Sequence, residues 1–290
     1  MKKLGLAAIN LAIIAVVAWY AYQAFDQYIQ NPWTRDGQVR GHVIQVAPRV
    51  SGMVTRIAVI DNQFVNEGDL LFEIDSETYE IAVAQADANL KRSRISSRAS
   101  KLEYDRLREI HSRDAGAVSQ KDLDRREANY LQSLSAIDVA EETLRMAQLN
   151  LGYTRVYAAV DGYISNIDFQ IGTQAVANQP LVALVDSNSF WVFGYFRENQ
   201  IGQFKIGDPA RVTLMAYPDQ QLEGHIESLG WGIAPSDGTT GYKLLPSIKP
   251  VFQWIRLAQR VPVRVKLDEV PEGVELRFGL TASVMVLKNN

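Results

Sequence analysis

The spacing of apolar residues divides the chain into segments, and the longest regular segment lies between residues 77 and 150. Apolar and small residues there recur every seven positions and do not alternate as they would in a strand. The seven-residue lines are Val83, Leu90, Ser97 and Tyr104, then Ala86, Ser93, Ser100 and Leu107, and later Leu123, Tyr130, Ile137, Leu144 and Leu151. Heptads of this kind are typical of coiled coils. They predict two long helices folded back on each other as a hairpin.

Turn residues between the two helical patterns predict the tip of this hairpin. The tip sequence is A-G-A-V-S, residues 115–119. Gly116 is expected at the C′ position that ends the first helix. Ser119 with Asp122 resembles a capping box that starts the return helix. Gly152 is expected to end the return helix in the same way as Gly116 ends the first.

A further apolar line on the first helix lies outside this seam. It consists of Ile81, Ala88, Ile95 and Leu102. One stripe per helix is enough for a two-helix hairpin, so the extra line needs another partner. It either covers the globular body or contacts the hairpin of a neighbouring protomer. We favour the neighbour, because a rod of about 35 helical residues extends roughly 50 Å from its base.

One short β-rich pattern flanks the hairpin on both sides, from Val50 to Asp75 and again from Val160 to Asp186. Val54 matches Ile164, and one inserted residue in the second copy then brings Val65 onto Val176. A repeat that is split by a helical insert suggests that its halves pair in space and hold the insert at its base.

Glycines are expected at the turns of this repeat. Gly52 and Gly162 hold matching places in the two copies. Gly68 lies in N-E-G-D between two apolar runs, where a hairpin turn needs a residue at positive φ.

Alternating, Gly-punctuated strands follow residue 188 and predict a small antiparallel barrel. The interval 230–259 is rich in Pro and Gly and is expected to be largely loop. At the other end of the chain, Lys2 and Lys3 precede an apolar run that is long enough to cross a bilayer. We expect an uncleaved anchor with the body outside the cytoplasm. The alternative is a cleaved signal peptide.

Composition and motifs exclude several classes of function. The net charge is −3, so nothing suggests a nucleic-acid partner. The chain has no cysteine and no histidine pair with metal-ligand spacing. A phosphate-binding glycine loop of the G-x-x-x-x-G-K-[ST] type is also absent. We therefore expect a protein that is not an enzyme and that has no cofactor or metal.

Taken together, these segments resemble the HlyD family of periplasmic adaptors, or membrane fusion proteins, of tripartite efflux pumps. The resemblance covers nearly the whole chain. It rests on the anchor, the split lipoyl-like repeat, the G-A-V-S tip, residues 151–158 (L-G-Y-T-R-V-Y-A) and the start of the barrel near Phe190. It implies an elongated protein of mixed α and β structure. The implied parts are a transmembrane anchor 1–25, a connector with first strands 26–48, lipoyl-like halves 49–75 and 152–187, an α-helical coiled-coil hairpin 76–151 and a β-barrel domain 188–290.

Lipoyl domains also serve as swinging-arm carriers, which need an acylated lysine on a tight turn. Ser76 and Glu77 follow the first half, and Ser187 and Asn188 follow the second. Since no lysine occupies either place, a carrier function is excluded.

Residues 31–36 (N-P-W-T-R-D) and 252–264 (F-Q-W-I-R-L-A-Q-R-V-P-V-R) carry a closer resemblance, to adaptors for aromatic carboxylic acids of the p-hydroxybenzoate type. This resemblance implies an FUSC-type inner-membrane transporter, a TolC-like outer-membrane channel and a ring of six protomers. The insert could contact the transporter or only close the barrel. Its candidate transporter-facing residues are Trp231, Trp254, Arg256 and Arg260.

Related adaptors carry an Arg at the tip, a Leu four residues later and a Ser seven after that. Arg108 and Ser119 hold the outer places here, but Ser112 replaces the Leu. With Gly116 and Val118, these residues are the candidate channel-docking site. Adaptors for multidrug efflux or type I secretion, and a cell-envelope scaffold that conducts nothing, remain alternatives.

Overall fold

The computed structural model describes residues 13–19, 31–114, 116–232, 234–235, 247–248 and 258–287. The chain divides into two compact units, one of residues 43–185 and one of residues 1–42 with 186–290. Residues 13–19 are helical, but most of the predicted anchor 1–25 lies outside the described residues. Within the described ranges, no helix has both the length and the hydropathy that a membrane span needs.

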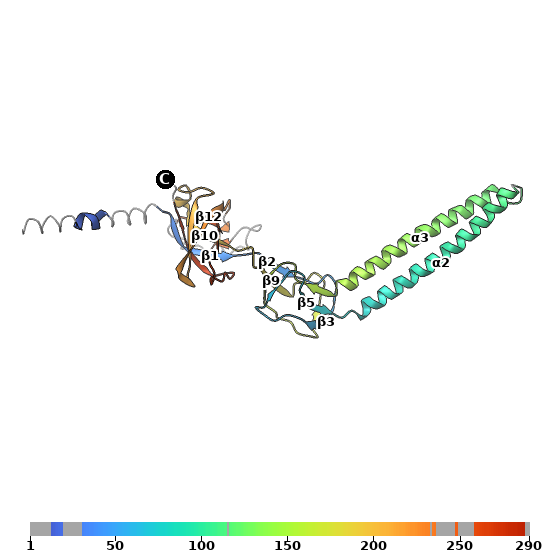
Figure 1. Ribbon diagram of the computed structural model, residues 1–290, viewed down its shortest axis with the longest axis horizontal. Coiled ribbons are helices and arrows are strands. Elements are labelled where there is room, and N and C mark those ends of the chain that lie inside the picture. Colours follow the sequence, from blue (N-terminus) through green and yellow to red (C-terminus); the bar gives the residue numbers. More distant parts are fainter. Residues whose placement is uncertain are drawn as a thin grey trace, which may run out of the picture. The chain divides into compact units, whose positions relative to one another are not determined.

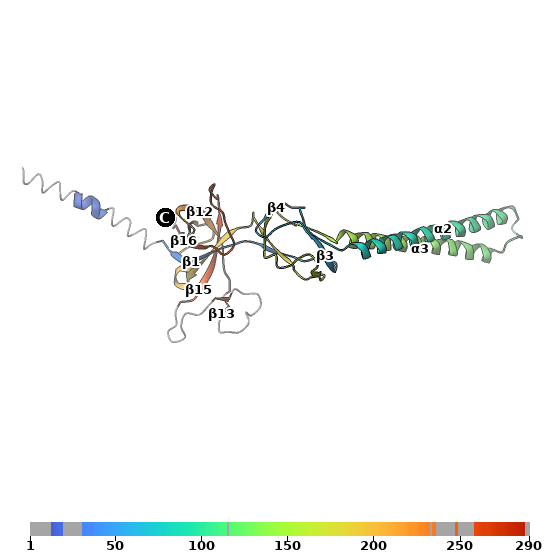
Figure 2. The same cartoon turned by 90° about the horizontal axis from the view of Figure 1, so that it is seen from below.

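The hairpin of the first unit consists of α2 (Glu77–Arg113) and α3 (Gln120–Gly152), which lie side by side in both ribbon views (Figures 1 and 2). The predicted seam is confirmed, because Ala86, Leu90 and Ser97 of α2 are buried against α3. On α3, Ala140 is buried, and the residues of the predicted heptad line are half-buried.

Contacts across the seam fix the register of the two helices. The Ser133 hydroxyl lies 3.1 Å from the hydroxyl of the buried Ser97 and also donates to a backbone carbonyl of its own helix. The rings of Tyr104 and Tyr130 stack with centroids 6.2 Å apart. Arg94 forms a 2.8 Å ion pair with Glu141, and Arg126 forms one of 3.1 Å with Glu103. Exposed ion pairs add little stability, but they help to specify which residues lie opposite each other.

The start and end of α3 agree with the sequence, whereas the predicted glycine stop of α2 does not. Ser119 accepts the amide hydrogen of Asp122 and caps α3, as predicted. Gly152 is the last residue of α3, as predicted, whereas Gly116 lies beyond the cap of α2 and does not end that helix. Asp114 caps α2 in an extended conformation, and α3 runs through Gly152 to a cap at Tyr153. Neither glycine has a positive φ, so neither is needed for its conformational freedom.

Two four-stranded sheets form the body that carries the hairpin. One sheet has the order β2-β9-β7-β4, and the other has the order β6-β5-β3-β8. Their strands are β2 (Val43–Val46), β3 (Gly52–Ile57), β4 (Phe64–Val65), β5 (Leu70–Ile74), β6 (Arg155–Tyr157), β7 (Gly162–Ser165), β8 (Gln174–Ala175) and β9 (Val182–Asp186). Val54, Phe72, Ile164 and Leu184 lie in their shared core.

The two halves of the repeat pair as predicted, but the second half contains no inserted residue. The amide of Val54 donates to the carbonyl of Thr173, and the amide of Ile164 donates in the same way to Gln63. Val65 pairs with Gly162, and Ala175 pairs with Gly52. Ala175 is therefore the equivalent of Val65. The predicted match to Val176 is wrong, because hydrophobic similarity favoured an exposed valine over the buried alanine beside it.

Of the three glycines predicted at turns, only Gly68 lies in one, with φ of 88°. Gly52 and Gly162 are instead the first residues of β3 and β7. A Cβ at Gly52 would lie 2.6 Å from the Cγ2 atom of Ile74. Close packing therefore explains the glycine at position 52.

The second unit contains a closed antiparallel barrel of order β1-β10-β15-β12-β11-β16, which confirms the predicted barrel. The elements are β1 (Trp33–Arg40), β10 (Trp191–Arg197), α4 (Glu198–Ile201), β11 (Pro209–Leu214), β12 (Tyr217–Leu229), β15 (Arg260–Leu267) and β16 (Thr281–Val286), with β13 (Ala234–Pro235) and β14 (Ser247–Ile248) as a short parallel pair. Strand β1 lies in the interval 26–48 that was predicted as connector and first strands, and it closes the barrel between β10 and β16. Val39 of β1 is fully buried in its core.

Candidate functional site at the hairpin tip

Hydrogen bonds to Asp114 and Ser119 hold the loop at the end of the hairpin. The carboxylate of Asp114 accepts the amide hydrogen of Gly116 at 2.9 Å. Its backbone carbonyl accepts the amide hydrogen of Ala117 at 3.1 Å. Ser119 closes the loop by capping α3 and by donating its hydroxyl to Asp122. The loop is therefore built from local bonds and presents a defined shape at the end of the rod.

The five predicted docking residues lie around this loop. Gly116 and Ser119 are exposed within it, and Val118 is half-buried. Arg108 and Ser112 lie one turn apart on the last part of α2, so they share a helix face. Within the described residues, the exposed Arg108 makes no hydrogen bond or ion pair, and its guanidinium group can bind a partner.

Ser112 is less available for a partner than its exposure suggests. Its hydroxyl donates a 2.8 Å hydrogen bond to the backbone carbonyl of Glu109. The Glu109 carboxylate in turn forms an ion pair with Arg113. Arg108, unlike Ser112, therefore keeps its polar groups unengaged within the described residues.

Sequence reasoning missed one side chain that reaches into the loop. His111 of α2 is half-buried, and its Nδ1 atom lies 3.1 Å from the backbone carbonyl of Val118. The signal was present in the sequence, because the heptad line that passes through Ser97 and Tyr104 reaches His111 at its next step. A polar side chain in a partly buried seam position is expected to form a hydrogen bond.

The second apolar line of α2 has no partner within its own unit. Ile81, Ile95 and Leu102 are all exposed, Ile95 by 71%. They therefore do not pack on the two sheets that carry the hairpin, which was one of the two roles considered for this apolar line.

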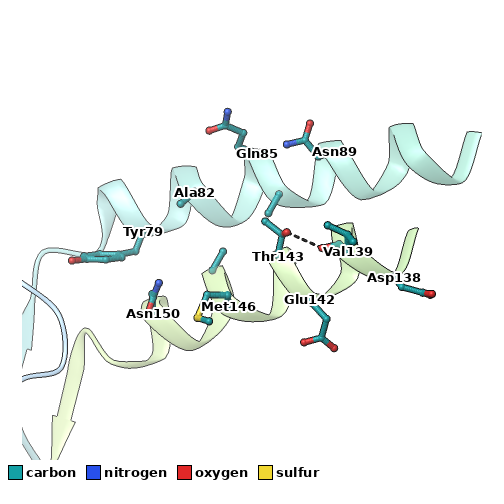
Figure 3. A pocket seen from close by; sticks show the side chains of 12 residues that line it. Tyr79, Ala82, Gln85, Asn89, Asp138, Val139, Glu142, Thr143, Met146 and Asn150 are labelled. Carbon is teal, nitrogen blue, oxygen red and sulfur yellow. Dashed lines mark hydrogen bonds between the residues drawn. The ribbon is translucent and has the colours of Figure 1, made fainter. Parts of the chain in front are cut away.

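A groove of about 800 Å³ runs along one flank of the hairpin near its base (Figure 3). Its apolar lining comes from both helices, namely Ala82, Ala86, Val139, Met146 and Ala147. Gln85, Asn89 and Glu142 point away from the space between the helices (Figure 3). This groove was not predicted from the sequence, although Val139 and Met146 are exposed apolar residues seven positions apart and off the seam.

Candidate residues in the other unit differ in their exposure and partners. Trp231 is fully exposed. Arg260 begins β15 and forms an ion pair with Asp36, which lies in β1 of the same barrel. Trp254 and Arg256 lie outside the described residues. In the described ranges, no group of His, Asp and Glu side chains is arranged to hold a metal ion.

Comparisons with protein families match both units. Residues 42–187 match the family model of the RND MFP barrel-sandwich hybrid domain, where MFP stands for membrane fusion protein. Residues 189–287 match the model of the AAEA-like beta-barrel domain. The two matches cover the body with its hairpin and most of the barrel.

Individual proteins resemble the chain over most of its length. It is 39% identical over 280 residues to the Escherichia coli (strain K12) protein YdhJ, described as uncharacterized, covering 96% of this chain and 95% of YdhJ. The membrane fusion protein Spr0693 from Streptococcus pneumoniae R6 matches with a TM-score of 0.62 at 18% identity, over 89% of this chain and 99% of that one. A MacA-MexA chimera with the Pseudomonas aeruginosa MexA α-hairpin domain matches with a TM-score of 0.59 at 24% identity, over 88% and 82%. At these identities, the solved structures support the fold alone.

Proposed function

The chain belongs to the family of membrane fusion proteins, and we propose that it is the periplasmic adaptor of a tripartite efflux pump that links an inner-membrane transporter to a TolC-like outer-membrane channel. One observation carries this proposal. A rod of two helices, 37 and 33 residues long, projects from a barrel-sandwich body and ends in a short loop that holds the exposed Gly116 and Ser119. At 1.5 Å per residue, α2 is roughly 55 Å long, enough to reach a partner well beyond its own body.

The adaptor is proposed to be an inner-membrane protein with its body in the periplasm. The proposed anchor is the apolar run within residues 1–25, preceded by Lys2 and Lys3. It takes no catalytic part and needs no cofactor. The transporter would supply the driving force, since no nucleotide-binding motif occurs in the sequence.

We further propose that the hairpins contact one another in a homo-oligomeric ring, taken as a hexamer. The ridge of Ile81 and Ile95 on α2 and the groove beside Met146 are different surfaces of one hairpin. Contact between unlike surfaces on identical copies is heterologous, and heterologous contacts close into rings when the rotation allows it. In the ring, Ile81 of one copy would enter the groove of the next.

Register within the hairpin supports this pairing. Ser97 lies opposite Ser133, and Arg94 lies opposite Glu141. Following the antiparallel pair towards its base brings Ile81 to the level of Leu149, within the span 138–150 that α3 contributes to the groove. Copies related by a rotation about the pump axis keep the same level, so Ile81 would meet the groove without a shift along the rod.

For the cargo, we propose aromatic carboxylic acids, with an FUSC-type protein as the transporter. The match to the AAEA-like barrel and the sequences at residues 31–36 and 252–264 support this choice over multidrug efflux or type I secretion. The test is to delete the gene and challenge cells with p-hydroxybenzoate and, separately, with unrelated drugs. Selective sensitivity to the acid, reversed by the intact gene, would support the proposal. Sensitivity only to drugs would redirect it to multidrug efflux, and no sensitivity would favour a scaffold.

A further inference from the structure

We propose that His111 positions the docking loop by tying α2 to the residue before the α3 cap. This inference rests on the proposed docking function of the tip. The Nδ1 atom of His111 lies 3.1 Å from the carbonyl oxygen of Val118. A carbonyl oxygen can only accept, so Nδ1 carries the hydrogen and donates it.

The bond complements the other contacts of the loop. Asp114 orders the first part of the loop through the amides of Gly116 and Ala117. Ser119 orders the start of α3. The His111 bond crosses between these two parts and joins the helices on either side of the loop. It thereby fixes how far Val118 stands from the end of α2.

The position of His111 in the seam explains why a histidine suits this role. It follows Tyr104 by one heptad and is half-buried, so its ring continues the packing of the seam. A leucine would fill the same position but could not donate to the carbonyl. Histidine combines an apolar ring body with a donor at its edge.

Three forms of the full-length protein separate the hydrogen bond from packing. His111→Leu keeps the volume and is a stronger helix former than histidine, but it lacks the donor. His111→Asn keeps a donor at nearly the same place, on the atom bonded to Cγ. Each is compared with the parent protein.

The first measurement is the mobility of a spin label in the loop, which does not depend on docking. Since the chain has no cysteine, a spin label on Ala117→Cys reports this loop alone in detergent-solubilised protein. We expect higher label mobility with His111→Leu and parental mobility with His111→Asn. Equal mobility in all three proteins would overturn the proposal.

The second measurement reads docking in cells, through the yield of a disulfide or crosslinker adduct from Val118→Cys to the outer-membrane channel. We expect His111→Leu to reduce the yield about fivefold, the factor that corresponds to one typical net hydrogen bond, and His111→Asn to restore it. If the parent forms the adduct and His111→Leu does so equally, the positioning role is refuted. If the parent forms none, the docking function fails, and the label mobility still decides whether His111 holds the loop.

Discussion

The hydroxyl of Tyr79, in the first turn of α2, donates a 2.7 Å hydrogen bond to the backbone carbonyl of Ser51. Ser51 also accepts the amide hydrogen of Ala177 on its own hydroxyl, from the second half of the repeat. This pair of bonds connects the base of the hairpin to both halves of the sandwich. A rod that docks at its tip needs such a fixed base, because small rotations there become large displacements at the loop.

Removing this hydroxyl should loosen the base of the hairpin. Tyr79→Phe is expected to lower the free energy of unfolding by about 1 kcal/mol, a typical net value for one hydrogen bond. Amide hydrogen exchange should become faster in the first turn of α2. Tyr153→Phe is the matched control, because its ring lies under the Arg49 guanidinium at 4.8 Å and its hydroxyl forms no hydrogen bond within the described residues. Equal exchange in both variants would contradict the role given to Tyr79.

Replacing the small Ser97 at the centre of the seam with a larger residue should destabilise the hairpin. Ser97 is only 4% exposed, so Ser97→Leu would overpack the two helices and cost about 1–3 kcal/mol. Ser96→Leu places the same side chain at the exposed neighbouring position and should be nearly neutral. Thermal unfolding of both proteins tests this, and equal melting temperatures would show that the seam is not closely packed at Ser97.

Charge placed in the proposed ring contact should dissociate the oligomer. Ile81→Glu or Met146→Lys is expected to weaken self-association at least about tenfold, or ~1.4 kcal/mol, because each buries a charge against apolar groups. Combining the two in one chain should restore association, since the ridge of one copy then carries the charge opposite to that in the groove of the next. Leu131→Glu, at an exposed apolar residue that does not line the groove, is the control.

Sedimentation velocity of the full-length protein in detergent measures these association states. Dissociation by Leu131→Glu to the same degree, or no restoration in the double variant, would refute the pairing of this ridge with this groove.

Arg260 and Trp231 should behave differently, although both were candidates to face the transporter. Arg260 is engaged with Asp36 in the barrel, and both side chains are nearly half-exposed. Arg260→Gln should therefore cost no more than about 1 kcal/mol of stability and leave transporter binding unchanged. Trp231→Ala should change stability by less than about 0.5 kcal/mol but reduce copurification with the transporter. The reverse pattern would assign the contact to Arg260.

The seam, the paired repeat and the barrel could be predicted because each rests on a periodic pattern. A heptad line such as Leu90 to Tyr104 predicts which face of the helix is buried, and that face is buried or half-buried in the structure. The matching of Val54 with Ile164 likewise identified the pairing of the halves.

The remaining features depend on contacts that no local pattern contains. Ala175, and not Val176, is the equivalent of Val65, because the pairing of Ala175 with Gly52 in β3 sets the register of the second half. Hydrophobicity alone does not reveal that pairing. Strand β1 closes the barrel through pairing with β16, which lies at the far end of the sequence. At the tip, four of the five predicted docking residues are exposed and Val118 is half-buried. The bond from His111 to Val118 depends on loop geometry.

In-cell crosslinking from the hairpin tip distinguishes an adaptor that docks on a channel from a non-conducting scaffold. Val118→Cys introduces a single thiol into a chain that has none, at the loop proposed to dock. We expect a specific adduct with the outer-membrane channel that disappears when the channel gene is deleted. A correctly folded and membrane-anchored protein that forms no such adduct would contradict the adaptor function and favour a non-conducting scaffold.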